Sequence, residues 1–340
     1  MQRTHRTSRI FWLLTSVLML LGAVPATTAA KGGPELWIMG QDTSRIFILK
    51  GSDLQETVQL PAGTGPHMTR FSPDGRFAYV SGVVSGDLIV LDAQTHEIIQ
   101  TLDLGTSGVH EAAPSPDGSE LFVAQQTTRE LIRVAVDPQT HMVTETGRLA
   151  LPASPVCTIL MPDSNKAYVT LSGQDLAIVD TVSMQITGMI DINGQARCNY
   201  DWATNGKLLY LTSENGTDSF VYVVDPTTDT PSLLYTFSGV RDIHSLVVNP
   251  NEKQISIIGR ASDRYYTLTL SDLSVTSFEL GTPGVSDQPD AMVIVGNTAY
   301  VNLKASGRLA TIQLNKGTIS YLDLATPSAN AALNVIRRHD

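Results

Sequence analysis

Three histidines stand at matching places in a sequence that repeats itself. His67, His110 and His244 each lie twelve residues before the middle of a short apolar segment, which reads AYV, LFV and ISI in turn. Neutral imidazole binds borderline metals such as zinc and copper, and three histidine ligands leave a coordination position open for water or substrate. If the fold brings the three rings together, this pattern predicts a transition-metal site, with zinc or copper as the candidate ion.

Charged side chains near the same repeat position enlarge this candidate binding site. They are Arg70, Glu111, Arg197, Asp242 and Asp290. Glu111 follows His110 directly and Asp242 precedes His244 by two residues, and a general base for a substrate is expected at such carboxylate–histidine neighbours. A plainer interpretation stays open beside this one, because polar side chains also satisfy backbone groups or ordered water in a narrow channel. No catalytic residue is assigned.

The two cysteines of the chain, Cys157 and Cys198, are a candidate disulfide. Cys198 lies twelve residues before the middle of its apolar segment, whereas Cys157 lies eleven before its own. Side chains alternate between the faces of a strand, so the two thiols have opposite parity on neighbouring repeats. A bridge between packed neighbours needs opposite parity, and an exported chain with an even cysteine count favours a bridge. Two inert buried thiols are the alternative.

The elements that must position these residues follow from the period of the repeat. The apolar segments are centred on Trp37, Tyr79, Phe122, Tyr168, Tyr210, Ser256 and Tyr300, in steps of 42, 43, 46, 42, 46 and 44 residues. Each is followed by further short β-branched segments with Gly, Pro, Asn and Asp between them, which is typical of strands and turns. Seven copies of this length predict an all-β fold, a seven-bladed β-propeller with four antiparallel strands per blade.

The two ends of the repeat predict how the ring closes. The segment at Trp37 has no first strand before it, whereas ALNVIRR at residues 332–338 has the character of a strand without a blade. A closing blade made from N- and C-terminal strands would remove two open sheet edges. The starts of the first strands would then lie around one mouth of a central channel, where the candidate residues would meet.

The first thirty residues predict export. Three arginines precede an apolar stretch from Ile10 to Val24 and small residues up to Ala30, as in a signal peptide. Fifteen apolar positions are fewer than the roughly 20 that span a bilayer. We therefore expect cleavage between Ala26 and Ala30, a mature single domain at 31–340 without a transmembrane anchor, and a periplasmic or extracellular location.

The charge of the mature chain argues against one class of partner. Without the three leader arginines, 20 basic residues remain of 23, against 33 acidic ones, which gives a net charge of −13. An acidic surface repels phosphate backbones, so nucleic acid is excluded as a partner.

The stretch SPDGRFAYVSG…GDLIVLDAQTHEIIQTLDLG at residues 72–105 resembles the YVTN-type β-propeller repeat of secreted bacterial and archaeal proteins, and AYVTL at 167 and AYVNL at 299 are further variants. The closing NVIRRHD and the chain length also resemble the propeller subunits of quinoprotein amine dehydrogenases. The resemblance implies the propeller fold. It leaves function open, because such propellers include lactonases, a streptogramin lyase, copper and haem electron-transfer enzymes, and binding scaffolds.

The function favoured at this point is an exported binding scaffold. Its channel mouth would present a site for a protein, a glycan or a small molecule. One alternative is a metal-assisted enzyme, a hydrolase, lyase or oxidoreductase, at the same mouth. The other is a propeller subunit of a quinoprotein dehydrogenase. The sequence does not decide whether the protein is an enzyme.

Overall fold

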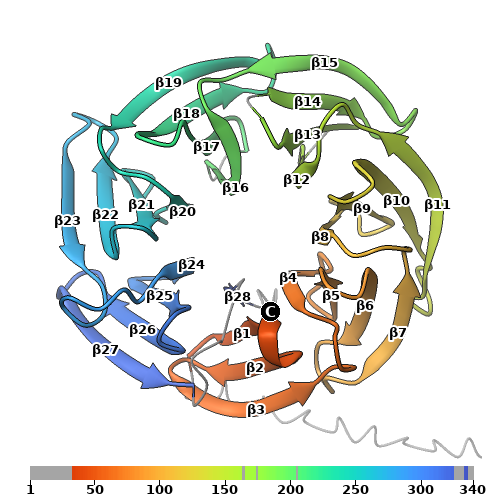
Figure 1. Cartoon of the computed structure of the whole chain (residues 1–340), viewed down its shortest axis with the longest axis horizontal. Coiled ribbons are helices and arrows are strands. Elements are labelled where there is room, and N and C mark those ends of the chain that lie inside the picture. The colour runs from red at the N-terminus through yellow and green to blue at the C-terminus, as the bar shows by residue number, and fades with distance from the viewer. Residues whose placement is uncertain (1–32, 163–164, 174, 204–205, 325–332, 336–340) are drawn as a thin grey trace, which may run out of the picture. The chain divides into compact units, whose positions relative to one another are not determined.

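The fold is known from a computed structural model that describes residues 33–162, 165–173, 175–203, 206–324 and 333–335. The predicted signal peptide lies outside these residues. In the described part of the chain, 28 strands form seven four-stranded antiparallel sheets, arranged as blades around a central channel (Figure 1). The predicted seven-bladed β-propeller is confirmed.

Blades 1 to 3 each run from an inner strand outward in chain order. Blade 1 consists of β4 (Pro66–Phe71), β5 (Phe77–Gly82), β6 (Asp87–Asp92) and β7 (Ile98–Asp103). Blade 2 consists of β8 (Val109–Pro114), β9 (Glu120–Gln125), β10 (Glu130–Val136) and β11 (Val143–Ala150). Blade 3 consists of β12 (Pro155–Leu160), β13 (Lys166–Leu171), β14 (Asp175–Asp180) and β15 (Gln185–Asp191).

Blades 4 to 6 repeat this order. Blade 4 consists of β16 (Gln195–Trp202), β17 (Leu209–Glu214), β18 (Ser219–Asp225) and β19 (Thr230–Phe237). Blade 5 consists of β20 (Ile243–Val248), β21 (Gln254–Gly259), β22 (Arg264–Thr269) and β23 (Val275–Glu279). Blade 6 consists of β24 (Pro289–Val295), β25 (Thr298–Leu303), β26 (Arg308–Gln313) and β27 (Thr318–Asp323).

The closing blade combines strands from both ends of the chain. Its order is β28 (Leu333–Val335), β1 (Glu35–Gly40), β2 (Arg45–Lys50) and β3 (Asp53–Gln59), and a single 3-10 turn, η1 (Gln41–Thr43), joins β1 to β2. Trp37 on β1 pairs with Asn334 on β28. The predicted closure is therefore confirmed; the rest of the predicted segment 332–338 lies outside the described residues.

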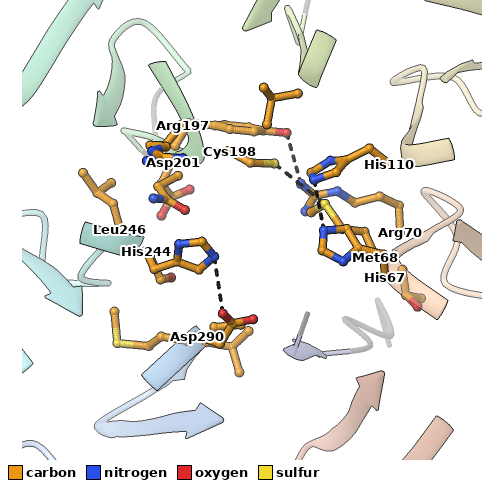
Figure 2. A pocket seen from close by; sticks show the side chains of 18 of the residues that line it. His67, Met68, Arg70, His110, Arg197, Cys198, Asp201, His244, Leu246 and Asp290 are labelled. Carbon is orange, nitrogen blue, oxygen red and sulfur yellow. Dashed lines mark hydrogen bonds and ion pairs between the residues drawn. The ribbon is translucent and has the colours of Figure 1, made fainter. Parts of the chain in front are cut away.

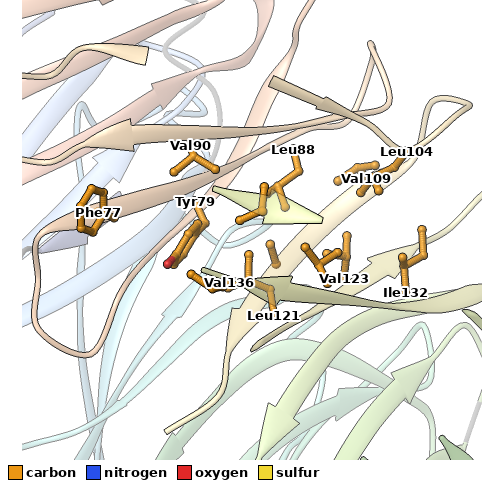
Figure 3. Close-up of a cluster of buried hydrophobic side chains, with 13 residues drawn as sticks. Phe77, Tyr79, Leu88, Val90, Leu104, Val109, Leu121, Val123, Ile132 and Val136 are labelled. Atoms are coloured by element: carbon orange, nitrogen blue, oxygen red, sulfur yellow. The ribbon is translucent and has the colours of Figure 1, made fainter. Parts of the chain in front are cut away.

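The core lies between neighbouring blades. Tyr79 and Val90 of blade 1 belong to the same buried cluster as Leu121, Val123 and Ile132 of blade 2 (Figure 3). Strand β5 is buried at every position because blades cover both of its faces, whereas the outermost strand β3 is almost wholly exposed. This explains why the second strands have continuous apolar sequences and the fourth strands polar ones.

The Ser-Pro-Asp-Gly turns serve the fold. Asp74 accepts hydrogen bonds from the backbone N–H of Arg76 at 3.1 Å and from the Ser72 hydroxyl, and Gly75 has a φ of +68°. Glycine adopts this left-handed conformation without the steric cost that other residues meet.

Within the described part of the chain, no helix has the length and apolar character needed to span a bilayer.

Candidate functional site

A cavity of about 720 Å³ opens at one mouth of the central channel. Two rings of side chains line it, one from the starts of the inner strands and one from the residues that follow the second strands. The first ring contains His67, His110, Val156, Cys198, His244 and Asp290. The second ring contains Gln41, Gln126, Ser172, Arg260 and Lys304. Both rings face one mouth because the two strands are antiparallel neighbours.

Irregular strand pairing directs the side chains of the first ring into the cavity. Each of the inner strands β4, β8, β12, β16, β20 and β24 shifts register against its partner at the ring position. In β8, for example, Val109 pairs with Gln125 and Glu111 with Ala124, so His110 between them has no partner residue. Such bulges re-aim a side chain and are common next to functional sites.

His67 and His110 form a contact pair at this mouth. Their Nε2 atoms lie 3.0 Å apart, and Nδ1 of His67 lies 3.0 Å from the side-chain oxygen of Gln41 (Figure 2). An amide oxygen can only accept, so Nδ1–H of His67 donates to Gln41, and Nε2 of His67 accepts a hydrogen bond from Nε2–H of His110. Nδ1 of His110 has no partner at normal hydrogen-bond geometry among the described residues. The backbone of Val156 lies near this ring and favours its charged form, which acts to raise the pKa of His110.

The histidine pair is held in the neutral form. Burial, together with the charges of His110, His244 and Lys304, lowers the pKa of His67 well below its usual value. Burial also lowers the pKa of His110, against the opposing effect of the Glu111 carboxylate. Neutral rings can accept protons or bind metals at neutral pH.

These lowered pKa values predict a pH-dependent stability. The unfolded chain binds protons near pH 6.5 where the folded chain does not, so the free energy of unfolding should fall as the pH drops from about 6.5 toward the folded pKa values. Each histidine contributes a slope of up to about 1.4 kcal/mol per pH unit. Urea unfolding of the double variant His67→Asn/His110→Asn should show a flatter dependence; a slope equal to that of the wild type would contradict this prediction.

His244 lies on the other side of the cavity, in a separate ionic cluster. Its Nδ1 is 3.3 Å from Asp242. Its Nε2 is 3.4 Å from Asp290 (Figure 2). Arg260 joins all three, with Nε 2.7 Å from Asp242 and Nη1 3.0 Å from Asp290. Burial opposes the charge of Asp242, but His244 and Arg260 outweigh it and keep the pKa of that carboxyl well below its usual value.

The structure therefore brings His67 and His110 together and leaves His244 apart from them. Among the described residues, the potential metal-ligand atoms that gather within 4.8 Å of one another belong to His110, Cys157 and Cys198. A metal site built from all three histidines stays a prediction.

Arg70 and Glu111 form an ion pair at the wall of the channel. The Glu111 carboxylate is fully buried and accepts hydrogen bonds from Nε of Arg70 and from the backbone N–H of Thr158, both at 2.8 Å. The Arg70 side chain remains 29% exposed and lines the cavity. Burial opposes the guanidinium charge, but Tyr200 and Glu111 outweigh it and raise the pKa of Arg70. Glu111 thus orients Arg70 and does not itself line the cavity.

Arg197 also lines the cavity and pairs with Glu214 at the end of β17. Burial lowers the pKa of Arg197. The second oxygen of Glu214 accepts the backbone N–H of Asp242 at 2.7 Å and so links blades 4 and 5.

Cys157 and Cys198 are joined by a disulfide between β12 and β16, with Cα atoms 5.3 Å apart. Cys198 lines the cavity, whereas Cys157 is fully buried. The bridge therefore connects blades 3 and 4 at the channel mouth.

Sequence reasoning missed the second ring. Gln126, Ser172, Arg260 and Lys304 each lie four residues after the centre of an apolar segment. The same period that located the histidines could have located these residues. This ring has two cations, Arg260 and Lys304. Arg260 pairs with Asp290, whereas no ion pair of Lys304 is found among the described residues.

Together the fold and this mouth define a seven-bladed β-propeller with a polar pocket at one end of its channel. The family model described as a seven-bladed β-propeller lactonase matches residues 36–190. No curated protein matches the chain.

Several solved structures share the fold. The periplasmic gluconolactonase PpgL of Pseudomonas aeruginosa has a TM-score of 0.70 at 13% identity, over 89% of this chain and 99% of that one. Hydrazine synthase of Kuenenia stuttgartiensis has a TM-score of 0.65 at 19% identity, over 77% of this chain and 80% of that one. Virginiamycin B lyase of Staphylococcus aureus has a TM-score of 0.63 at 12% identity, over 78% and 86%. At these identities the likeness concerns the fold.

Proposed function

We propose that this protein is an exported binding propeller whose channel mouth takes a small, hydroxyl-rich molecule of the sugar or sugar-lactone class. The observation that carries this proposal is the composition of the cavity wall. Charged and uncharged hydrogen-bond donors and acceptors line a cavity of about 720 Å³. This volume lies within the usual range of small-molecule pockets, about 300–1,000 Å³.

Apart from Lys304, the charges on the wall are balanced, which favours a neutral ligand over a strongly charged one. Arg70, Arg197 and Arg260 each face a carboxylate that already balances the guanidinium charge. The amides of Gln41, Gln126, Gln195 and Asn199 and the hydroxyl of Tyr200 add uncharged donors and acceptors. Hydroxyl groups can donate and accept at once, so a polyol satisfies such a mixed wall without leaving buried charges unpaired.

Export is part of the proposal. It rests on the basic, apolar and small-residue order of residues 1–30, and it agrees with the periplasmic location named for the similar PpgL. A disulfide at the channel mouth suits an oxidising compartment.

Lactone hydrolysis is a second candidate function, which the histidine pair favours. A neutral imidazole that accepts a proton can activate water, and His67 and His110 line the cavity side by side. The match of residues 36–190 to the lactonase family model supports the same reaction class. A metal-assisted reaction at this mouth stays a weaker alternative, because His244 contacts Asp242 and Asp290 instead of the other two histidines.

A thermal-shift experiment tests the binding function. D-glucose, D-gluconate and D-glucono-1,5-lactone are the probes, and a ligand at a hundred times its dissociation constant should stabilise the fold by about 2.7 kcal/mol. A shift with the lactone or the sugar is the expected result. If none of the three probes shifts the melting temperature at saturating millimolar concentration, the proposal is wrong. Acid release from the lactone, followed by pH-stat against a protein-free control, separates hydrolysis from binding.

A further inference from the structure

A sulfur-rich cluster formed by His110, Cys157, Cys198 and Met68 lies on the wall of the cavity. One ring nitrogen of His110 and the sulfurs of Cys157 and Cys198 all lie within 4.8 Å of one another. The thioether of Met68 lies 3.7 Å from Sγ of Cys198 (Figure 2). These four residues come from β4, β8, β12 and β16, the inner strands of four consecutive blades.

Two features of the cluster go beyond what a structural disulfide requires. The His110 ring turns one nitrogen to within 4.8 Å of both cysteine sulfurs. The Met68 sulfur lies against Cys198 on the cavity side, where both residues line the pocket. A bridge that only joined two blades would need neither an imidazole nor a thioether beside it.

The bridge is open to exchange from one side. Cys198 lines the cavity, whereas Cys157 is fully buried. A thiolate of an external dithiol would attack Sγ of Cys198, and Cys157 would leave as a thiolate and take up a proton. The second thiol of the dithiol would then attack its own sulfur in the mixed disulfide and release Cys198. The dithiol is oxidised to a disulfide, and the two cysteines are reduced to thiols.

We propose that reduction of this disulfide creates a copper(I) site formed by His110, Cys157, Cys198 and Met68. Two thiolates and a thioether are soft ligands, and soft ligands select copper(I) over harder ions. Zinc sites use thiolate, imidazole and carboxylate ligands, so the thioether favours copper. Binding releases the two thiol protons. The site shares Met68, His110 and Cys198 with the wall of the cavity proposed above to bind sugars, but copper binding is measured without any sugar present.

Competition with a chromogenic copper(I) chelator tests this proposal on the full-length exported protein. The protein is reduced with dithiothreitol, desalted without oxygen and titrated into copper(I) bicinchoninate. We expect the reduced protein to withdraw one equivalent of copper(I) and the oxidised protein to withdraw none. Circular dichroism checks that the reduced protein remains folded; loss of the fold on reduction would overturn the proposal.

Variants assign the ligands. The double variant Cys157→Ser/Cys198→Ser should withdraw no copper, because both thiolates are gone. Met68→Leu should weaken binding about tenfold or more, whereas Met161→Leu, a buried methionine outside the cavity, should leave it unchanged.

Three further results would overturn the proposal. Copper could stay on the chelator in the presence of reduced wild-type protein. The double serine variant could withdraw as much copper as the wild type. Zinc(II) could bind the reduced protein while copper(I) does not. Each readout is independent of sugar binding, so this proposal and the proposed function can fail separately.

Discussion

Replacement of Glu111 by alanine is expected to lower the free energy of unfolding by about 3–5 kcal/mol, the usual cost of breaking a buried ion pair. The Glu111 side chain has no exposed surface, and its loss would leave Arg70 without its main counter-charge and the N–H of Thr158 without an acceptor. Urea denaturation followed by circular dichroism measures the change.

A matched pair in the same blade provides the control. Glu120 pairs with Arg133, and both side chains are partly exposed, at 24% and 28%. Exposed pairs contribute about 0–1 kcal/mol, so Glu120→Ala should cost that amount at most. Equal losses for Glu111→Ala and Glu120→Ala would show that the channel wall does not depend on the buried carboxylate.

Removal of residues 330–340 is expected to abolish cooperative unfolding or to cause aggregation. The deletion takes away β28, whose Leu333 and Val335 pair with Ile38 and Leu36 of β1. Strand β1 would then present an unpaired edge toward the channel, and such edges template association. Size-exclusion chromatography and calorimetry measure the outcome.

Deletion of residues 336–340 alone is the control, because it keeps β28 (Leu333–Val335). This shorter chain should remain monomeric and melt cooperatively. A monomeric protein with an unchanged melting curve after the longer deletion would contradict the closure of the ring by β28.

The repeat predicted the blades because every blade solves the same packing problem. Continuous apolar second strands such as FAYVSG at β5 are required wherever blades cover both faces of a sheet. Blade 6 departs from the twelve-residue spacing of the other blades. Counting twelve residues back from Tyr300 reaches Gln288, but the register shift of β24 falls between Pro289 and Ala291, at Asp290. The hairpin after β24 has a two-residue turn, since Val295 pairs with Thr298, so the ring position lies ten rather than twelve residues before the centre of the second strand.

The roles of the site residues were harder to predict from the sequence than their position at one mouth of the channel. The period located His67, His110 and His244 at one mouth, but partners across the ring decide their roles. His244 is engaged by Arg260, which no local pattern had singled out. Glu111 follows a bulged residue and so points between the blades rather than into the cavity, and strand alternation alone does not specify this.

The central claim, that the channel mouth binds a small hydroxyl-rich molecule, is tested most directly by calorimetric titration with the probe that gives the largest thermal shift. The decisive comparison is between Lys304→Met at the cavity wall and Lys316→Met on the exposed surface. We predict one binding site in the wild type, an unchanged affinity in Lys316→Met and an affinity at least about tenfold lower in Lys304→Met, a loss of about 1.4 kcal/mol or more. Equal affinities in the two variants would place the ligand outside this cavity and contradict the account.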